Sequence, residues 1–72
     1  MIEIQNMKDV GLAVRSARRA QGVSQTALAR LSNVGLRFLC DVERGKDSVH
    51  SGKLLAVLAS LGIAVRLDIP KA

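Results

Sequence analysis

The chain has 72 residues, of which 49% are apolar, so it is too short for two domains and too apolar to be disordered. Phe38 is its only Phe, Tyr or Trp, which argues against binding of single-stranded nucleic acid on aromatic platforms. The net charge of +5 favours a polyanionic partner, although on charge alone a basic protein without such a partner is equally compatible.

The single cysteine, Cys40, and the single histidine exclude an intrachain disulfide and a metal cluster, so we expect no metal and no cofactor. A reducing compartment fits this composition. The longest apolar run is too short to span a membrane, and the first ten residues lack the features of a signal peptide. We therefore expect a cytoplasmic, nucleoid-associated protein.

Residues 1–5 alternate in hydrophobicity, which indicates either a weak strand or an ordered arm. Asn6 is a plausible N-cap for a helix over 7–21, and Gly22 is suited to end it. The helix carries one apolar face at i, i+3, i+4 and i+7, formed by Val10, Ala13, Val14 and Ala17.

Ser24 is a good N-cap for a short helix over 25–31, and residues 32–34 form a turn. Asn33 stands where a left-handed residue is needed, a conformation that Asn tolerates better than most residues. Gly35 then opens a helix over 36–44, which Gly45 closes.

After a polar loop over 46–50, we expect Ser51 to cap a helix over 52–61. Its apolar stripe is formed by Leu54, Leu55, Leu58 and Leu61, with Val57 at the edge.

Beyond Gly62 the hydrophobic period changes to two, which is typical of a strand over 63–69 that Pro70 terminates. The recurring apolar residues are Ile63, Val65, Leu67 and Ile69. A lone strand leaves its backbone groups unpaired, so we predict that it pairs with the same strand of a second copy across a two-fold axis, giving a homodimer.

The stretch from Gln25 to Arg44, QTALARLSNVGLRFLCDVER, has apolar residues where two short helices must face each other, and small Ala29 where they cross. It resembles the helix-turn-helix of the phage-repressor-like (Cro/C1, or Xre) DNA-binding family. It departs from the family pattern at Asn33 and Gly35. The resemblance implies an all-α, lambda-repressor-like bundle of four or five helices in a single domain over 1–72, with the C-terminal β-strand pairing across the homodimer.

In that family the second helix of the motif enters the major groove and its first residues face base edges. Arg37 would then donate two hydrogen bonds to a guanine, and Leu36 would meet a thymine methyl. Asp41 would either accept from a cytosine or orient Arg37 through an i, i+4 pair. The free backbone amides at Gln25 suit a phosphate, and Arg44 and Lys46 are candidate phosphate contacts, with exposed surface charge as the alternative.

The predicted DNA-contacting set is Ser24, Gln25, Gly35, Leu36, Arg37, Cys40, Asp41, Arg44 and Lys46. The resemblance further implies a structural ion pair between Arg18 and Glu43 that ties the first helix to the third. Phe38 is expected to pack in the core rather than to contact a base. The sequence contains no recognisable nucleophile, base or metal constellation, so we expect no enzymatic activity.

The run NVGLRFLCDVERGK and the ending VLASLGIAVRLDIP are similar to small HipB-like antitoxins. This resemblance implies a DNA-binding repressor that controls its own operon and binds a HipA-like kinase toxin. Two alternatives stay open: a stand-alone Xre-family regulator, and a protein-binding module that mainly restrains a partner enzyme.

Overall fold

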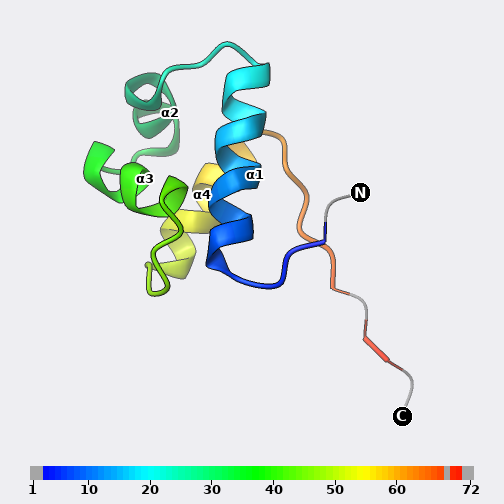
Figure 1. Cartoon of the computed structure of the whole chain (residues 1–72). Coiled ribbons are helices and arrows are strands. Elements are labelled where there is room, and N and C mark those ends of the chain that lie inside the picture. The colour runs from blue at the N-terminus through cyan, green and yellow to red at the C-terminus, as the bar shows by residue number, and fades with distance from the viewer. Residues whose placement is uncertain (1–2, 68, 71–72) are drawn as a thin grey trace.

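Figure 1 shows the computed structural model, which describes residues 3–67 and 69–70. Its helices are α1 (Met7–Ala20), α2 (Gln25–Ser32), α3 (Leu36–Glu43) and α4 (Ser51–Ser60). Helix α3 packs against both α1 and α2, and α4 packs against α2. The prediction of an all-α bundle is confirmed, with four helices in the described part of the chain.

The core is entirely aliphatic. Its buried hydrophobic residues are Val14, Leu28, Ala29, Leu39, Val42, Val57 and Leu61. The apolar stripe of α4 differs from the prediction, because Val57 is fully buried whereas Leu55 is 54% exposed. The buried face of α4 follows the i, i+3, i+4, i+7 spacing of residues 54, 57, 58 and 61, which turns Leu55 towards solvent.

Local signals set the ends of the first three helices. The side chain of Asn6 accepts a hydrogen bond from the Asp9 amide at 2.9 Å, and the Ser24 hydroxyl accepts one from the Ala27 amide at 3.1 Å. Asn33 ends α2 with φ of 55°, in the left-handed region. These three predictions are confirmed, and the predicted boundaries of α1 to α3 are within one residue of those observed.

The cap of α4 differs from the prediction. The N-cap is His50 rather than Ser51, because the Nδ1 atom of His50 accepts a hydrogen bond from the Lys53 amide at 3.2 Å. Ser51 is instead the first helical residue. A neutral imidazole has one acceptor nitrogen and so can replace a hydroxyl, although Ser is much the commoner cap.

Gly11 permits the close crossing of α1 over α3. A Cβ atom placed there would lie 2.9 Å from the carbonyl oxygen of Glu43 and would also clash with that of Val42. Both obstacles are backbone atoms that no change of side-chain rotamer can move. Gly11 therefore sets the distance between the two helices that flank the site described below.

The C-terminal segment leaves the bundle after Gly62 and runs away from it (Figure 1). Ile63 still packs against the core, whereas Val65, Leu67 and Ile69 are 58%, 83% and 84% exposed. No strand is assigned in the described residues of this segment, and Asp68, within the predicted strand, lies outside them. The described residues of the N-terminal arm, 3–5, form no strand either, and residues 1–2 lie outside the description.

Candidate nucleic-acid interface

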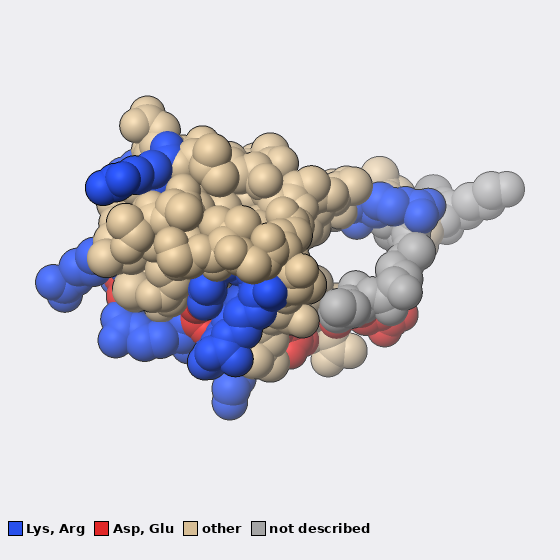
Figure 2. Space-filling model, turned by 90° about the horizontal axis from the view of Figure 1, so that it is seen from above, with Lys and Arg blue, Asp and Glu red and all other residues tan. Residues whose placement is uncertain are grey.

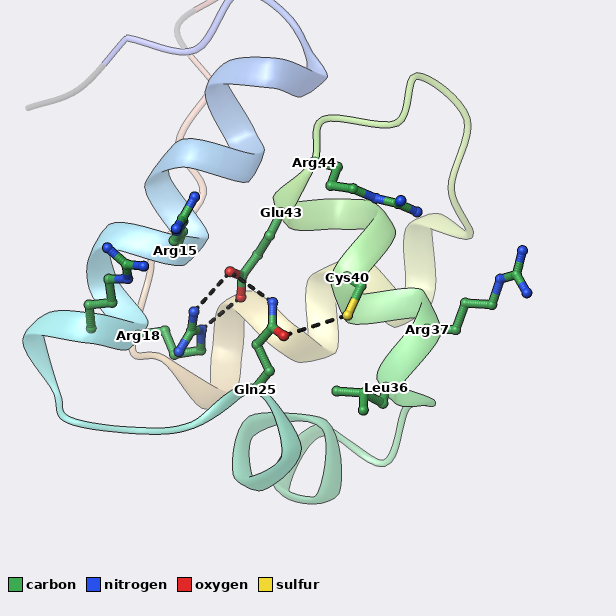
Figure 3. Close-up of a pocket in the computed structure, with 9 residues that line it drawn as sticks. Arg15, Arg18, Gln25, Leu36, Arg37, Cys40, Glu43 and Arg44 are labelled. Atoms are coloured by element: carbon green, nitrogen blue, oxygen red, sulfur yellow. Dashed lines mark hydrogen bonds and ion pairs between the residues drawn. The ribbon is translucent and has the colours of Figure 1, made fainter.

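An open groove of about 820 Å³ runs between α1, the start of α2 and the exposed side of α3 (Figure 3). Its lining consists of Arg15, Arg18, Arg19, Gln25, Leu36, Arg37, Cys40, Glu43 and Arg44. Five of these nine residues are arginines and only one is acidic, so the groove has a strongly positive rim. Such a concave basic surface attracts polyanions and concentrates them locally.

The groove brings together five of the nine predicted DNA-contacting residues, namely Gln25, Leu36, Arg37, Cys40 and Arg44. The other four lie outside its lining: Ser24, Gly35, Asp41 and Lys46. Two residues of α1 outside the predicted set, Arg15 and Arg19, line the groove as well. Their i, i+4 spacing beside Arg18 was a usable signal, since it places three guanidinium groups on neighbouring parts of one helix.

Arg18 and Glu43 form an ion pair at the bottom of this groove. Arg18 Nε lies 2.8 Å from Glu43 Oε2, and Arg18 Nη2 lies 3.0 Å from Glu43 Oε1. Arg18 Nη1 also donates to the carbonyl oxygen of Val23 at 2.9 Å. The hydrogen bond to Glu43 raises the pKa of Arg18, against the opposing effect of burial. The pair therefore joins α1, the α1–α2 connection and α3 through two side chains that are only 11% and 5% exposed.

Gln25 extends this ion pair into a longer network. Its Nε2 atom donates to Glu43 Oε1 at 3.2 Å, and its Oε1 atom accepts from Cys40 Sγ at 3.5 Å. Figure 3 shows the Gln25 side chain between these two partners. A residue expected only as a surface contact at the start of α2 is thus held by side chains of α3.

The expected pair between Asp41 and Arg37 does not form. Asp41 instead pairs with Arg44, and its Oδ2 atom lies 3.7 Å from Lys46 Nζ. An acidic residue that precedes its basic partner along a helix is favoured over the reverse order, which explains the choice of Arg44. The hydrogen bond from Arg44 lowers the pKa of Asp41, and the nearby charge of Lys46 contributes in the same direction.

Arg37 is left exposed at the start of α3. Among the described residues no carboxylate forms an ion pair with it. Its side chain extends away from the bundle, while neighbouring Leu36 is 46% exposed (Figure 3). Its guanidinium is therefore available to an external acceptor.

Phe38 is not among the residues that line the groove, and it packs against the core, as predicted. The Nζ atom of Lys53 lies 5.9 Å from the centroid of its ring, within the range of a cation–π contact. This contact joins α3 to α4.

The basic side chains are not spread evenly. Figure 2 shows most of the visible Lys and Arg along the left and lower margins of the bundle, with small acidic areas among them and a separate basic area at the right, while other residues cover the centre. In residues 3–67 and 69–70 no group of three or more His, Cys, Asp or Glu could hold a metal ion. Over the same residues, none of the helices has both the length and the apolar character needed to cross a membrane.

Comparison with known sequences gives one informative relative. No protein-family model matches the chain. The uncharacterized HTH-type transcriptional regulator y4mF of Sinorhizobium fredii (strain NBRC 101917 / NGR234) is 40% identical over 67 residues, which cover 93% of this chain and 88% of that protein.

Solved structures of similar shape include HipB in its complex with the O4 20mer, with a TM-score of 0.87 and 20% identity over 99% of this chain and 100% of that chain. HipB in a HipA–HipB–O2–O3 complex gives the same values. At 33% identity and a TM-score of 0.73, the restriction-modification controller protein C.AhdI from Aeromonas hydrophila matches 81% of this chain and 88% of its own. The fold is therefore that of the Xre-type helix-turn-helix regulators, as the motif predicted.

Proposed function

Since the chain belongs to the HTH-type transcriptional regulators, which are DNA-binding proteins and not enzymes, we propose that it is a repressor that recognises a specific double-stranded operator. The observation that supports this most directly is the arginine-lined groove beside α3. Arg37, which forms no ion pair among the described residues, is exposed in the first turn of α3. An α-helix fits the major groove, and the residues of its first turn reach the base edges.

In this proposal α3 reads bases. Arg37 has the free guanidinium needed for two parallel hydrogen bonds to guanine O6 and N7. Leu36 offers an exposed apolar surface to a thymine methyl, and Asp41 is close enough to Arg44 and Lys46 to restrain both. Asp41 is therefore assigned to positioning those two side chains rather than Arg37.

Phosphates would be held by the surrounding elements. Arg15 and Arg19 of α1 line one wall of the groove, and Arg44 lines the other. Ser24, Gly35 and Lys46 lie at helix ends or in the following loop, where backbone amides and a flexible ammonium can meet the DNA backbone. These contacts would fix the register of α3 without reading sequence.

The test compares two single substitutions on two DNAs. Arg37→Ala should weaken binding to an operator, obtained by selection from random duplexes, by roughly 1–3 kcal/mol and should change binding to random DNA much less. Lys46→Ala should weaken both about equally, because phosphate contacts carry no sequence information. Unchanged operator affinity in Arg37→Ala, with specific binding by the wild type, would contradict the assignment of α3 as the reader.

We further propose that the protein acts as a homodimer. The exposed Val65, Leu67 and Ile69 form an alternating apolar row that a single copy leaves uncovered. Pairing of residues 63–69 with the same residues of a second copy would give the backbone groups hydrogen-bond partners and would bury this apolar row. Two recognition helices related by a two-fold axis would then match a palindromic operator.

A HipA-like kinase toxin is the partner we propose for this dimer, with control of a shared operon. The support is the likeness in fold to HipB, a protein solved together with HipA, over 99% of the chain. A stand-alone regulator, or a module that mainly restrains an enzyme, would have the same fold. Co-purification from the native operon distinguishes them. A co-eluting kinase together with operator binding supports the antitoxin role, a co-eluting kinase without operator binding favours the restraining module, and the absence of a kinase favours the stand-alone regulator.

A further inference from the structure

Gln21 connects the end of α1 to the end of α4. Its Nε2 atom donates a hydrogen bond of 2.8 Å to the carbonyl oxygen of Leu61, which lies 40 positions further along the chain. Gln21 is the C-cap of α1, and Leu61 is the C-cap of α4. The helix pairs that pack extensively are α1 with α3, α2 with α3 and α2 with α4. The bond from Gln21 therefore links two helices that do not form such a pair.

The peptide unit between Leu61 and Gly62 is held at both of its ends. The Gly62 amide donates to the carbonyl oxygen of Ala59 at 3.0 Å, and the Leu61 carbonyl accepts from Gln21. A carbonyl at a helix C-cap has no partner within its own helix, so the Gln21 side chain supplies a bond that the helix cannot. Rotation of this peptide unit would break both hydrogen bonds.

The turn that follows α4 is otherwise a common one. Gly62 has φ of 73°, and the Ile63 amide donates to the Leu58 carbonyl at 2.9 Å, as in a Schellman motif. That motif engages the two amides but not the Leu61 carbonyl. Glycine adopts φ of either sign with similar ease, so the backbone at Gly62 can rotate when this carbonyl is not held. The bond from Gln21 thus opposes a change in the direction of the C-terminal segment, which leaves the bundle at this point (Figure 1).

Gln21 also begins the α1–α2 connection, which is fixed to α3. Arg18 Nη1 donates to the carbonyl oxygen of Val23 in this connection at 2.9 Å. The same Arg18 side chain binds Glu43 of α3 through two hydrogen bonds. The point at which the C-terminal segment leaves the bundle is therefore tied, through one short connection, to the helix that is proposed to read bases.

We propose that Gln21 is a positioning residue that fixes the direction of the C-terminal segment and thereby sets the separation of the two α3 helices in the dimer. This inference rests on the proposed function and deepens it, because it makes one hydrogen bond a determinant of the half-site spacing of the operator. Two helices that read one palindrome must match half-sites about one helical turn, or a multiple of it, apart. The two-fold axis repeats any change of segment direction in both copies, so such a change alters their separation.

The first arm of the test needs no DNA. In the full chain, 15N relaxation of the Gly62 amide should give an order parameter near the ~0.85 of rigid backbone in the wild type. In Gln21→Met, which keeps the length of the side chain but donates no hydrogen bond, it should fall towards the ~0.6 of flexible backbone. Gln21→Lys keeps a donor on a long side chain and should stay near the wild type. An equally rigid Gly62 in Gln21→Met would overturn the inference whatever the protein does with DNA.

The second arm measures how strictly the protein requires one half-site spacing. The probes are the selected operator and two copies of it, with one base pair inserted or removed between the half-sites. The wild type should bind these altered duplexes about tenfold or more weakly than the operator, because protein or DNA must deform to reach both half-sites. Gln21→Met should reduce this penalty to about threefold or less, and Gln21→Lys should retain most of it. The ratio of the two affinities is compared because the added charge of Lys affects all three duplexes alike.

A spacing penalty in Gln21→Met equal to that of the wild type would overturn the positioning role while leaving the proposed function intact. Equal losses of the penalty in Gln21→Met and Gln21→Lys would do the same, since the donor would then not be the cause. Melting curves identify a variant that fails to fold, and Gln21→Ala replaces it in both arms.

A wild-type protein that bound an isolated half-site as tightly as the palindrome would instead overturn the proposed binding as a dimer, and the spacing role with it. The two failures are distinguishable because this one is seen in the wild type, before any substitution is made.

Discussion

At Gly11 the absence of a side chain determines how closely two helices approach. The carbonyl oxygens of Val42 and Glu43 occupy the space that a Cβ atom would need, and both belong to the last turn of α3. Glu43 is also the residue that binds Arg18 and Gln25. A small backbone displacement at this crossing would therefore move the carboxylate that binds Arg18 and Gln25.

Replacing Gly11 by Ala should destabilise the protein. Overpacking should lower the free energy of unfolding by about 1–3 kcal/mol. The better helix propensity of Ala should offset up to about 1 kcal/mol of this loss. Ser16→Ala, an exposed site on the same helix, is the matched control and should leave the melting temperature unchanged or slightly raised. A Gly11→Ala protein as stable as the wild type would mean that α1 and α3 can separate at little cost.

Asp41 should make a pH-dependent contribution to the stability of the fold. Its pKa is lowered below the ordinary value of 3.8 by the hydrogen bond from Arg44, so its contribution to stability is present above that value and is lost as the pH falls through the lowered pKa. The melting temperatures of wild type and Asp41→Asn should therefore differ at pH 6 and converge below about pH 4. A difference that persisted unchanged into strong acid would exclude the charge of Asp41 as its cause.

Among the helices, α3 has the weakest N-terminal cap. Its N-cap is Gly35, which has no side chain to accept a hydrogen bond, whereas α1, α2 and α4 begin with Asn6, Ser24 and His50. A Cβ at Gly35 would meet no atom within 4 Å, and the backbone there has φ of −71°, so a larger residue fits without strain. Helix α3, the proposed recognition helix, is thus the one helix of the four in the described structure without a side-chain cap.

Gly35→Ser should supply the missing acceptor and stabilise the chain by about 0.5 kcal/mol, which raises the melting temperature of a domain this small by roughly 2–4 °C. Gly35→Ala is the control, because it restricts the unfolded chain in a similar way but offers no oxygen to the free amides. Equal melting temperatures for the two variants would show that capping is not the cause. Thermal unfolding followed by circular dichroism measures both.

The elements themselves were predictable where a local signal specifies them. Asn33, Ser24 and the glycines that follow the helices mark boundaries through backbone preferences that act within a few residues. The cap at His50 and the crossing at Gly11 were not predictable in this way. The first depends on a ring nitrogen that caps helices only rarely, and the second on a contact between residues more than thirty positions apart.

The site was predictable to the same extent. The motif spacing indicated Leu36 and Arg37 on α3, and the family resemblance indicated the pair of Arg18 and Glu43, which does form. The alignment of Gln25 with Cys40, and the choice of Arg44 over Arg37 by Asp41, depend on side-chain rotamers set by packing. Sequence spacing leaves several such partners equally accessible, so it could not decide among them.

For the whole molecule, the exposed C-terminal row predicts self-association. A chain that ends at Ala64 keeps Ile63, which packs against the core, but loses Val65, Leu67 and Ile69. It should fold and sediment as a monomer at concentrations at which the full chain is a dimer. Leu67→Lys in the full chain should weaken the dimer in the same direction, and a truncated protein that remained dimeric would place the interface elsewhere.

The small aliphatic core has a consequence for how long each copy of the protein survives in a cell. Seven buried hydrophobic residues in the described structure give little reserve of stability, so ligands that bind only the folded state change the unfolded fraction substantially. An operator present at a hundred times its dissociation constant adds about 2.7 kcal/mol, which lowers that fraction about a hundredfold. Proteases that attack the opened chain would accordingly remove free copies first, and under the proposed function the copies bound to an operator would be degraded last.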